Sequence, residues 1–170
     1  GSTTFAVQFD PNTVGAKSAQ LTIASDDSNY PSYVVNLTGA GDLNLLWSGA
    51  NTNWDTTTAA SWLVLSDAVI NSAFINNAAT VVFDDSGSAS TNVNLVGGLS
   101  PVAVAVNATN SNYTFGGAGS LTGAASLTKS GTGTLTIINS NTYSGPTTIT
   151  AGTLQLGNGT IGQDGNLSSP

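Results

Sequence analysis

The 170-residue chain carries two cationic side chains against nine acidic ones, a formal charge of −7, and it contains no Cys, His or Met. Without Cys and His it cannot build the usual zinc or iron–sulfur site, a catalytic thiol or a Ser-His-Asp triad. Two cations are too few for a nucleic-acid surface, and no apolar run is long enough for membrane insertion. We therefore expect no cofactor, no nucleic-acid partner and no membrane span.

The remaining composition favours an all-β fold. Ser, Thr, Asn and Gly together make up about half of the chain, and only 6% of residues are charged, against about 25% in ordinary domains. Hydrophobic residues still reach 39%, so the composition is not that of a disordered tail. Val, Ile and Thr suit strands, whereas Gly and Asn suit turns. The absence of Cys fits an extracellular bacterial protein and a cytosolic one equally.

Residues 1–41 show three short segments in which apolar and polar residues alternate. These are Phe5–Phe9, Ala19–Ile23 and Tyr33–Leu37, followed by the closing Gly39–Gly41. The three segments begin about 14 residues apart, and strands at such intervals are typical of a small antiparallel sandwich. We take residues 1–41 as one domain and residues 42–170 as a second.

The second region predicts a β-solenoid. Short apolar stretches bounded by Gly, Asn or Ser recur along it, and no segment keeps a helical period. The stretch GTLTIIN from Gly133 is echoed by GTLQLGN from Gly152, and such fixed-offset echoes are typical of stacked turns. The predicted strands are Thr80–Phe83, Asn92–Val96, Val102–Val106, Tyr113–Phe115, Thr134–Ile138, Thr147–Thr150 and Thr153–Leu156.

Stacking of these turns assigns roles to particular residue types. Aligned Asn residues are expected to form ladders inside the turns. Glycines are expected at tight corners with positive φ, and aligned leucines and isoleucines are expected in the interior. The interior set is Leu135, Ile137, Leu154 and Leu156, and the corner set is Gly131, Gly133, Gly145 and Gly152.

Residues 127–160 strongly resemble the autotransporter-associated β-strand repeat, also called the passenger-associated repeat. The resemblance implies a right-handed parallel β-helix in a secreted or outer-membrane-exported bacterial protein, extracellular or at the cell surface. It implies a stalk without established catalytic residues. The matching positions are Lys129, Gly131, Gly133, Leu135, Asn141, Tyr143, Gly145, Thr147, Thr148, Gly152 and Leu154.

Residues 1–41 resemble the C-terminal half of a Hydin-like, choice-of-anchor D type immunoglobulin-like domain. The resemblance rests on Thr3–Pro11, Gly15, Ala19–Asp27 and Leu37–Gly41. Half a domain would leave unpaired strand edges and an uncovered apolar face, which a second copy or the rest of a longer parent chain would complete. The predicted assembly edge comprises Phe5, Val7, Phe9, Leu21 and Ile23.

Aspartate and lysine side chains are the titratable candidates for a chemical site. Asp84-Asp85 is the best carboxylate pair for glycan cleavage, but consecutive strand residues point to opposite faces and Asp is a common turn former. Asp26-Asp27 and Asp84-Asp85 are also calcium candidates. The loop that begins at Asp84 does not contain the Glu that completes an EF-hand loop. Lys129 is expected on a solvated face. No catalytic or metal residue is assigned.

The tryptophan cluster supplies the remaining ligand candidate. Trp47, Trp54 and Trp62 fall within 16 residues and are the protein's three tryptophans. Flat aromatic faces would form a stacking platform for cell-surface or matrix glycans. The alternative is that the rings cover the open end of the solenoid.

These observations favour a non-enzymatic structural segment of a bacterial surface protein, such as a stalk, an adhesin or a self-assembling fibre subunit. The alternative is a glycan-binding accessory module that uses the three tryptophans. A glycan-cleaving β-helix enzyme is a weaker alternative, because the chain has no His.

Overall fold

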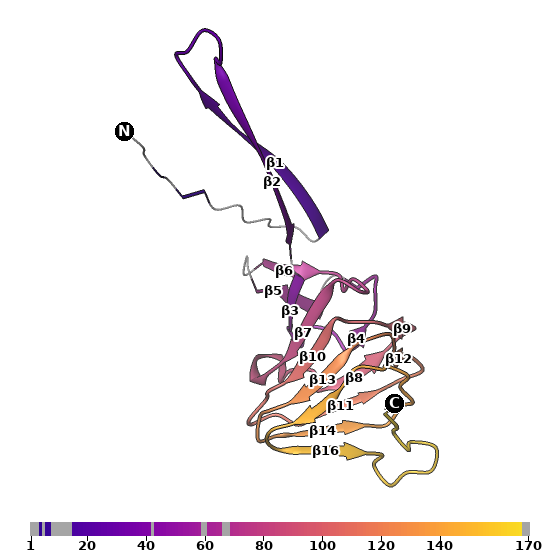
Figure 1. Ribbon diagram of the computed structural model, residues 1–170. Helices are drawn as coiled ribbons and strands as arrows, with labels where there is room; N and C mark the ends of the chain where they lie inside the picture. Colours follow the sequence, from indigo (N-terminus) through magenta and orange to yellow (C-terminus); the bar gives the residue numbers. More distant parts are fainter. Residues whose placement is uncertain are drawn as a thin grey trace. The chain divides into compact units, whose positions relative to one another are not determined.

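The computed structural model describes residue 4 and residues 6–7, 15–41, 43–58, 61–65 and 69–167 (Figure 1). These residues fall into two compact units, Gly1–Asp42 and Leu43–Pro170. Within the described ranges there is no α-helix, and therefore no helix that is long and apolar enough to cross a membrane. The all-β prediction is confirmed.

The first unit contains a long antiparallel hairpin. Strand β1 (Gly15–Ala24) pairs with β2 (Ser32–Gly41), and Leu21 lies opposite Val35. Because side chains alternate between faces, one face of the hairpin carries the apolar pairs Ala19–Leu37, Leu21–Val35 and Ile23–Tyr33. The other face is mainly polar, although it includes the exposed Val34 opposite Thr22, and there Gln20 Nε2 donates to Asn36 Oδ1 at 3.0 Å.

The hairpin accounts for two of the three strands predicted in this unit. Phe5 and Phe9 lie outside the described residues, whereas Val7 is described, belongs to no strand and is 47% exposed. The described residues therefore form a hairpin and not a sandwich. The immunoglobulin-like prediction is not supported.

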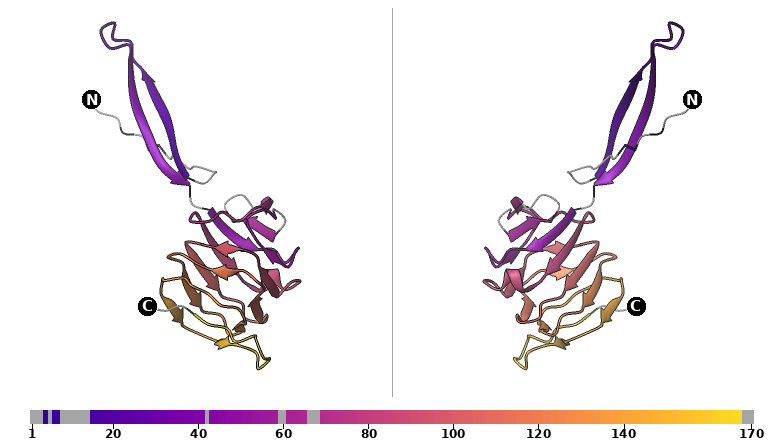
Figure 2. Two further views of the ribbon diagram at one scale, coloured as in Figure 1. Left: turned by 90° about the vertical axis from the view of Figure 1, so that its right-hand side faces the viewer. Right: turned by 90° about the vertical axis from the view of Figure 1, so that its left-hand side faces the viewer.

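The second unit is a β-solenoid of about four turns, as predicted (Figures 1 and 2). Its largest sheet has the order β15-β13-β10-β7-β3-β5-β6, and the second has the order β16-β14-β11-β8-β4. The first sheet is made of β3 (Leu43–Trp47), β5 (Trp62–Val64), β6 (Val69–Ser72), β7 (Ala79–Phe83), β10 (Ala103–Val106), β13 (Ser126–Lys129) and β15 (Thr147–Ile149). The second is made of β4 (Asn53–Trp54), β8 (Asn92–Leu95), β11 (Tyr113–Gly116), β14 (Thr134–Ile137) and β16 (Thr153–Leu156).

Three shorter elements complete the turns. Strand β9 (Gly98–Leu99) pairs in parallel with β12 (Ser120–Leu121). A 3₁₀ turn, η2 (Asp85–Gly87), follows β7 at a corner. Each full turn thus passes through the two large sheets before it enters the next turn.

The 19-residue echo in the sequence corresponds to one turn of the solenoid. Thr134 pairs with Thr153, and Leu135 pairs with Leu154. Leu135 and Ile137 are fully buried as predicted, whereas Leu154 is half-buried and Leu156 is 49% exposed. The interior prediction is therefore wrong for Leu156, because β16 is the outermost strand of its sheet and no further described turn covers it.

The opposite end of the solenoid contains an insertion. Leu43 pairs with Ala79, 36 residues later, whereas Thr80 pairs with Ala103, 23 residues later. The additional residues include β5 and β6, which extend the sheet antiparallel to β3 and to each other. This end therefore departs from the parallel stacking of the later turns.

The corner glycines serve two different purposes. Of the four predicted to have positive φ, Gly152 does, at 72°, but Gly131, Gly133 and Gly145 do not. At Gly131 the cause is close approach, because a Cβ there would lie 2.0 Å from the carbonyl oxygen of Ala108 in the preceding turn. The positive-φ explanation is therefore wrong for Gly131, which is needed for contact between turns.

Asparagine side chains connect the turns at one corner, as predicted. Asn141 Oδ1 accepts from the backbone N–H of Leu121 at 2.8 Å, and Asn139 Nδ2 donates to the carbonyl oxygen of Gly119 at 2.7 Å. Both asparagines are buried. They satisfy backbone groups that the strands leave unpaired.

Candidate functional site

The three tryptophans lie inside the solenoid, in its first turns. Each has an exposed fraction of 0%. Trp62 packs edge-on between the other two, with ring centroids 5.1 Å from Trp47 and 5.4 Å from Trp54. Phe83 lies 5.5 Å from Trp47 and 5.4 Å from Trp54, while Phe74 lies 5.4 Å from Trp54. The rings fill the interior of this end of the fold.

Because the three rings are buried, the prediction that they form a glycan-stacking platform is wrong. Sugar stacking needs a ring face open to solvent, and none of these three side chains has one. Trp47 Nε1 donates to the carbonyl oxygen of Ser90 at 2.8 Å, whereas the buried Nε1 atoms of Trp54 and Trp62 have no hydrogen-bond partner in the described part of the chain. The cluster contributes apolar burial and edge-to-face contacts to the core.

Asp84 and Asp85 are both engaged in holding turns. Asp84 Oδ1 accepts from the backbone N–H of Ser86 at 2.8 Å and from the Ser86 hydroxyl. Asp85 accepts from the backbone N–H groups of three successive residues of the next turn, at 2.9–3.2 Å: Thr109, Asn110 and Ser111. The two carboxylates thus serve different loops.

The charge state of Asp85 follows from these contacts. Partial burial acts to raise its pKa, but hydrogen bonds from Asn110, Thr109 and Ser111 outweigh burial and hold the pKa below its usual range. A glycosidase acid must instead stay protonated near its working pH. Nearby, Tyr113 donates its hydroxyl to the Asp84 carbonyl oxygen at 2.7 Å, and burial followed by the charges of Asp84 and Asp85 raises the Tyr113 pKa.

The calcium candidates do not form a cluster. No group of three or more acidic side chains suited to a metal ion occurs among the described residues. Asp27 is at the tip of the β1–β2 hairpin, where its Oδ1 accepts from the backbone N–H of Asn29 at 2.8 Å. Asp26-Asp27 and Asp84-Asp85 also belong to separate units of the chain. The carboxylates of Asp27, Asp84 and Asp85 therefore act in holding turns.

Lys129 lies inside the solenoid, so its predicted place on a solvated face is wrong. Its exposed fraction is 0%, and its Nζ donates to the carbonyl oxygen of Gly131. Burial lowers the pKa of the ammonium group. A cation within the repeat thus binds a corner carbonyl, a role that sequence spacing alone did not indicate.

The predicted assembly edge is only partly described. Leu21 is half-buried and Ile23 is 38% exposed, and both lie on the apolar face of the hairpin. Val7 is exposed, while Phe5 and Phe9 lie outside the described residues. Assembly through this edge stays a prediction.

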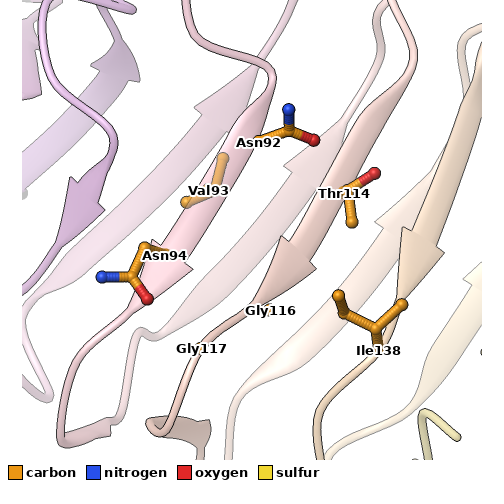
Figure 3. A pocket seen from close by; sticks show the side chains of 7 residues that line it. All are labelled: Asn92, Val93, Asn94, Thr114, Gly116, Gly117 and Ile138. Carbon is orange, nitrogen blue, oxygen red and sulfur yellow. The ribbon is translucent and has the colours of Figure 1, made fainter. Parts of the chain in front are cut away.

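A surface hollow on the second sheet was not anticipated from the sequence (Figure 3). It has a volume of about 240 Å³ and lies across β8, β11 and the end of β14. No sequence signal marked it, because alternation along β11 places Gly116 outward, whereas Gly116 is buried directly after the buried Phe115. Its lining residues are Asn92, Val93, Asn94, Thr114, Gly116, Gly117 and Ile138.

Comparison with known proteins identifies one segment of the chain. Residues 127–156 match the passenger-associated-transport-repeat family, which confirms the predicted repeat. No curated protein and no solved structure matches the chain. The matched segment runs from β13 to β16, so the family repeat coincides with the last turns of the solenoid. The repeat and the solenoid together fit a structural segment of an autotransporter passenger.

Proposed function

We propose that this chain is a non-enzymatic stalk segment of a bacterial surface protein. The observation that carries the proposal is the match of residues 127–156 to the passenger-associated-transport-repeat, on strands that pair in register from turn to turn. The repeat family implies a secreted or cell-surface protein. A stalk needs length and stiffness more than a reaction centre, and stacked parallel turns supply both.

The contacts between turns support a mechanical role. Strand pairing is continuous through β7, β10, β13 and β15 on one sheet, and asparagine side chains connect the corners. The absence of a side chain at Gly131 allows two adjacent turns to lie in close contact. Because almost every step along the axis repeats the same hydrogen bonds, bending or local opening would break several at once.

The acidic residues support the absence of catalysis. Asp85 is held ionised by backbone N–H groups, and Asp84 is bonded to Ser86. Neither side chain has a His or Arg partner, since the chain has no His and its two cations are Lys17 and Lys129. We infer that glycan cleavage is not the activity of this segment.

Self-association is a second proposal, and it rests on the hairpin. A two-stranded hairpin is marginally stable by itself, and its apolar face includes the exposed pair Ile23 and Tyr33. A second copy of this chain would cover that face. Light scattering would show a dimer or larger species, and Ile23→Asp would return it to monomer, whereas Thr22→Asp on the polar face would not.

The stalk proposal is tested on the source cells. Antibodies against the purified chain should label intact bacteria, and protease treatment of intact cells should remove the signal. Labelling only after lysis would overturn the surface location. The purified chain should also release no reducing ends from polygalacturonate, and release that is lost in Asp84→Asn would overturn the non-enzymatic assignment.

A further inference from the structure

The surface hollow lies next to Ile138, whose side chain covers a glycine of the neighbouring strand. On β11, Tyr113 and Phe115 face the core and Thr114 is at an outward position, whereas Gly116 at the end of the strand is buried. Gly116 lies beside Asn94 of β8. A Cβ on Gly116 would lie 2.9 Å from the Cδ1 and Cγ1 atoms of Ile138, so the Ile138 side chain occupies the place of a Gly116 side chain and borders the hollow (Figure 3).

The rim of the hollow carries uncommitted hydrogen-bonding groups. Within the described residues, neither the Asn92 amide nor the Thr114 hydroxyl has a hydrogen-bond partner, although both side chains line the hollow. Asn94 is partly committed, because its Nδ2 donates to Asn53 Oδ1 at 2.8 Å, which leaves Oδ1 as an acceptor. Both donors and acceptors therefore surround the apolar surface of Ile138.

The hollow contains no charged side chain. None of its lining residues is titratable. A charged ligand would lose hydration there without gaining a countercharge, and a purely apolar ligand would leave the amide and hydroxyl groups unpaired. A ring with hydroxyl groups on its edge and C–H groups on its face meets both requirements, since binding sites combine apolar surface with a few placed polar groups.

We propose that this hollow is a subsite for one ring of a neutral glycan. The ring packs its C–H face on Ile138, and its hydroxyl groups bond to Asn92, Asn94 and Thr114. Neighbouring strands lie about 4.8 Å apart, close to the length of one sugar ring. A glycan that runs along the solenoid axis therefore passes from Thr114 to Thr136, its neighbour on β14. This binding is an addition to the stalk role and does not depend on it.

The test is an NMR titration of the ¹⁵N-labelled chain with three neutral probes, maltohexaose, cellohexaose and N-acetylchitohexaose. We expect at least one probe to shift the side-chain amide signals of Asn92 and Asn94 and the backbone signals of Gly116 and Gly117. Millimolar affinity is expected for so shallow a site. Absence of shifts with all three probes, or shifts confined to other residues, would overturn the proposal.

Two glycine variants make the test specific. Gly116→Val pushes the Ile138 side chain out of its place beside the hollow and should weaken binding at least tenfold. Gly98→Val, the same change on β9 where the nearest atom is 3.9 Å away, should leave binding unchanged. Asn92→Ala with Thr114→Val removes the polar rim without adding bulk and should also weaken binding. Equal binding by these variants would overturn the site, and stronger binding of oligogalacturonate would overturn its preference for neutral sugars.

Discussion

Asn166 Oδ1 accepts a hydrogen bond from the backbone N–H of Asn141 at 2.9 Å, and Asn141 in turn accepts from the backbone N–H of Leu121 at 2.8 Å. Each asparagine thus bonds to the turn before it. Asn141 Nδ2 also donates to the carbonyl oxygen of Asn166 at 3.2 Å, so the central residue bonds in both directions. This ladder connects successive turns at a corner where strand pairing is interrupted.

Asn141→Ala should therefore destabilise the solenoid. The substitution leaves the buried N–H of Leu121 without an acceptor, which costs about 1–3 kcal/mol. Urea unfolding followed by tryptophan fluorescence measures this loss. Asn158→Ala is the matched control, because Asn158 is exposed and bonds within its own loop. Equal losses of unfolding free energy in the two variants would contradict a stabilising role for the asparagine ladder.

Gly131→Ala should be more damaging than its small size suggests. The added methyl group would lie 2.0 Å from the Ala108 carbonyl oxygen, which is backbone and cannot turn aside. The turns must separate locally, at a cost of about 1–3 kcal/mol or more. Gly98→Ala adds the same group where the nearest atom is 3.9 Å away, and its unfolding midpoint should match the parent protein. The comparison is made by thermal unfolding.

Two tryptophans of the cluster should respond differently to the same substitution. Trp47→Phe leaves the Ser90 carbonyl oxygen without its donor, whereas Trp62→Phe removes an indole N–H that has no partner in the described residues. Both changes lose packed volume. We expect Trp47→Phe to lower the unfolding free energy by about 1 kcal/mol more than Trp62→Phe does. A larger loss in Trp62→Phe would show that its N–H is bonded after all.

The repeat was predictable from the sequence, but the surroundings of individual side chains were not. Stacked turns keep the same residues at the same positions, so the echo from Gly133 to Gly152 predicted the observed pairing of Leu135 with Leu154. Burial depends in addition on which turns lie on either side, and Leu156 is exposed because its strand is outermost. A local pattern does not contain that information.

The tryptophans and the hollow show the same limit. An aromatic ring suits a sugar platform and a core equally well, and Trp54 is buried by residues distant in sequence, including Phe115 at 5.9 Å. The hollow at Gly116 needs Asn94 and Ile138 from neighbouring strands. The sequence spacing indicated that strands exist here. To predict which side chains meet on one face of the sheet, the pairing register between the strands must also be known.

Acid should weaken the protein partly through Asp85. Its pKa in the folded chain is lowered by hydrogen bonds from the next turn, so the folded state binds a proton less readily than the unfolded state. The resulting stability is present above the unfolded pKa of about 3.9 and is lost as the pH falls through the lower folded value. Asp85→Asn should flatten this acid limb of the urea midpoint, and an unchanged limb would contradict the role of Asp85.

The contribution of Lys129 to stability should increase as the pH rises into the alkaline range. Burial lowers its folded pKa below the ordinary value of 10.5, so between these two values the unfolded chain binds more protons and stability rises with pH. Lys129→Met keeps much of the side-chain volume and lacks the titrating group. Burial raises the pKa values of Tyr113 and Tyr143, which lowers stability at high pH in both proteins.

The quantity to measure is therefore the difference in unfolding free energy between the parent protein and Lys129→Met, from pH 7 to 10.5. Because the tyrosine contribution is common to both, it cancels, and the difference should shift in favour of the parent as the pH rises. Lys17→Met provides the control for the loss of one positive charge, since Lys17 is a partly exposed residue in the other unit. A difference for Lys129→Met that does not change with pH would mean that its ammonium group reaches water in the folded chain.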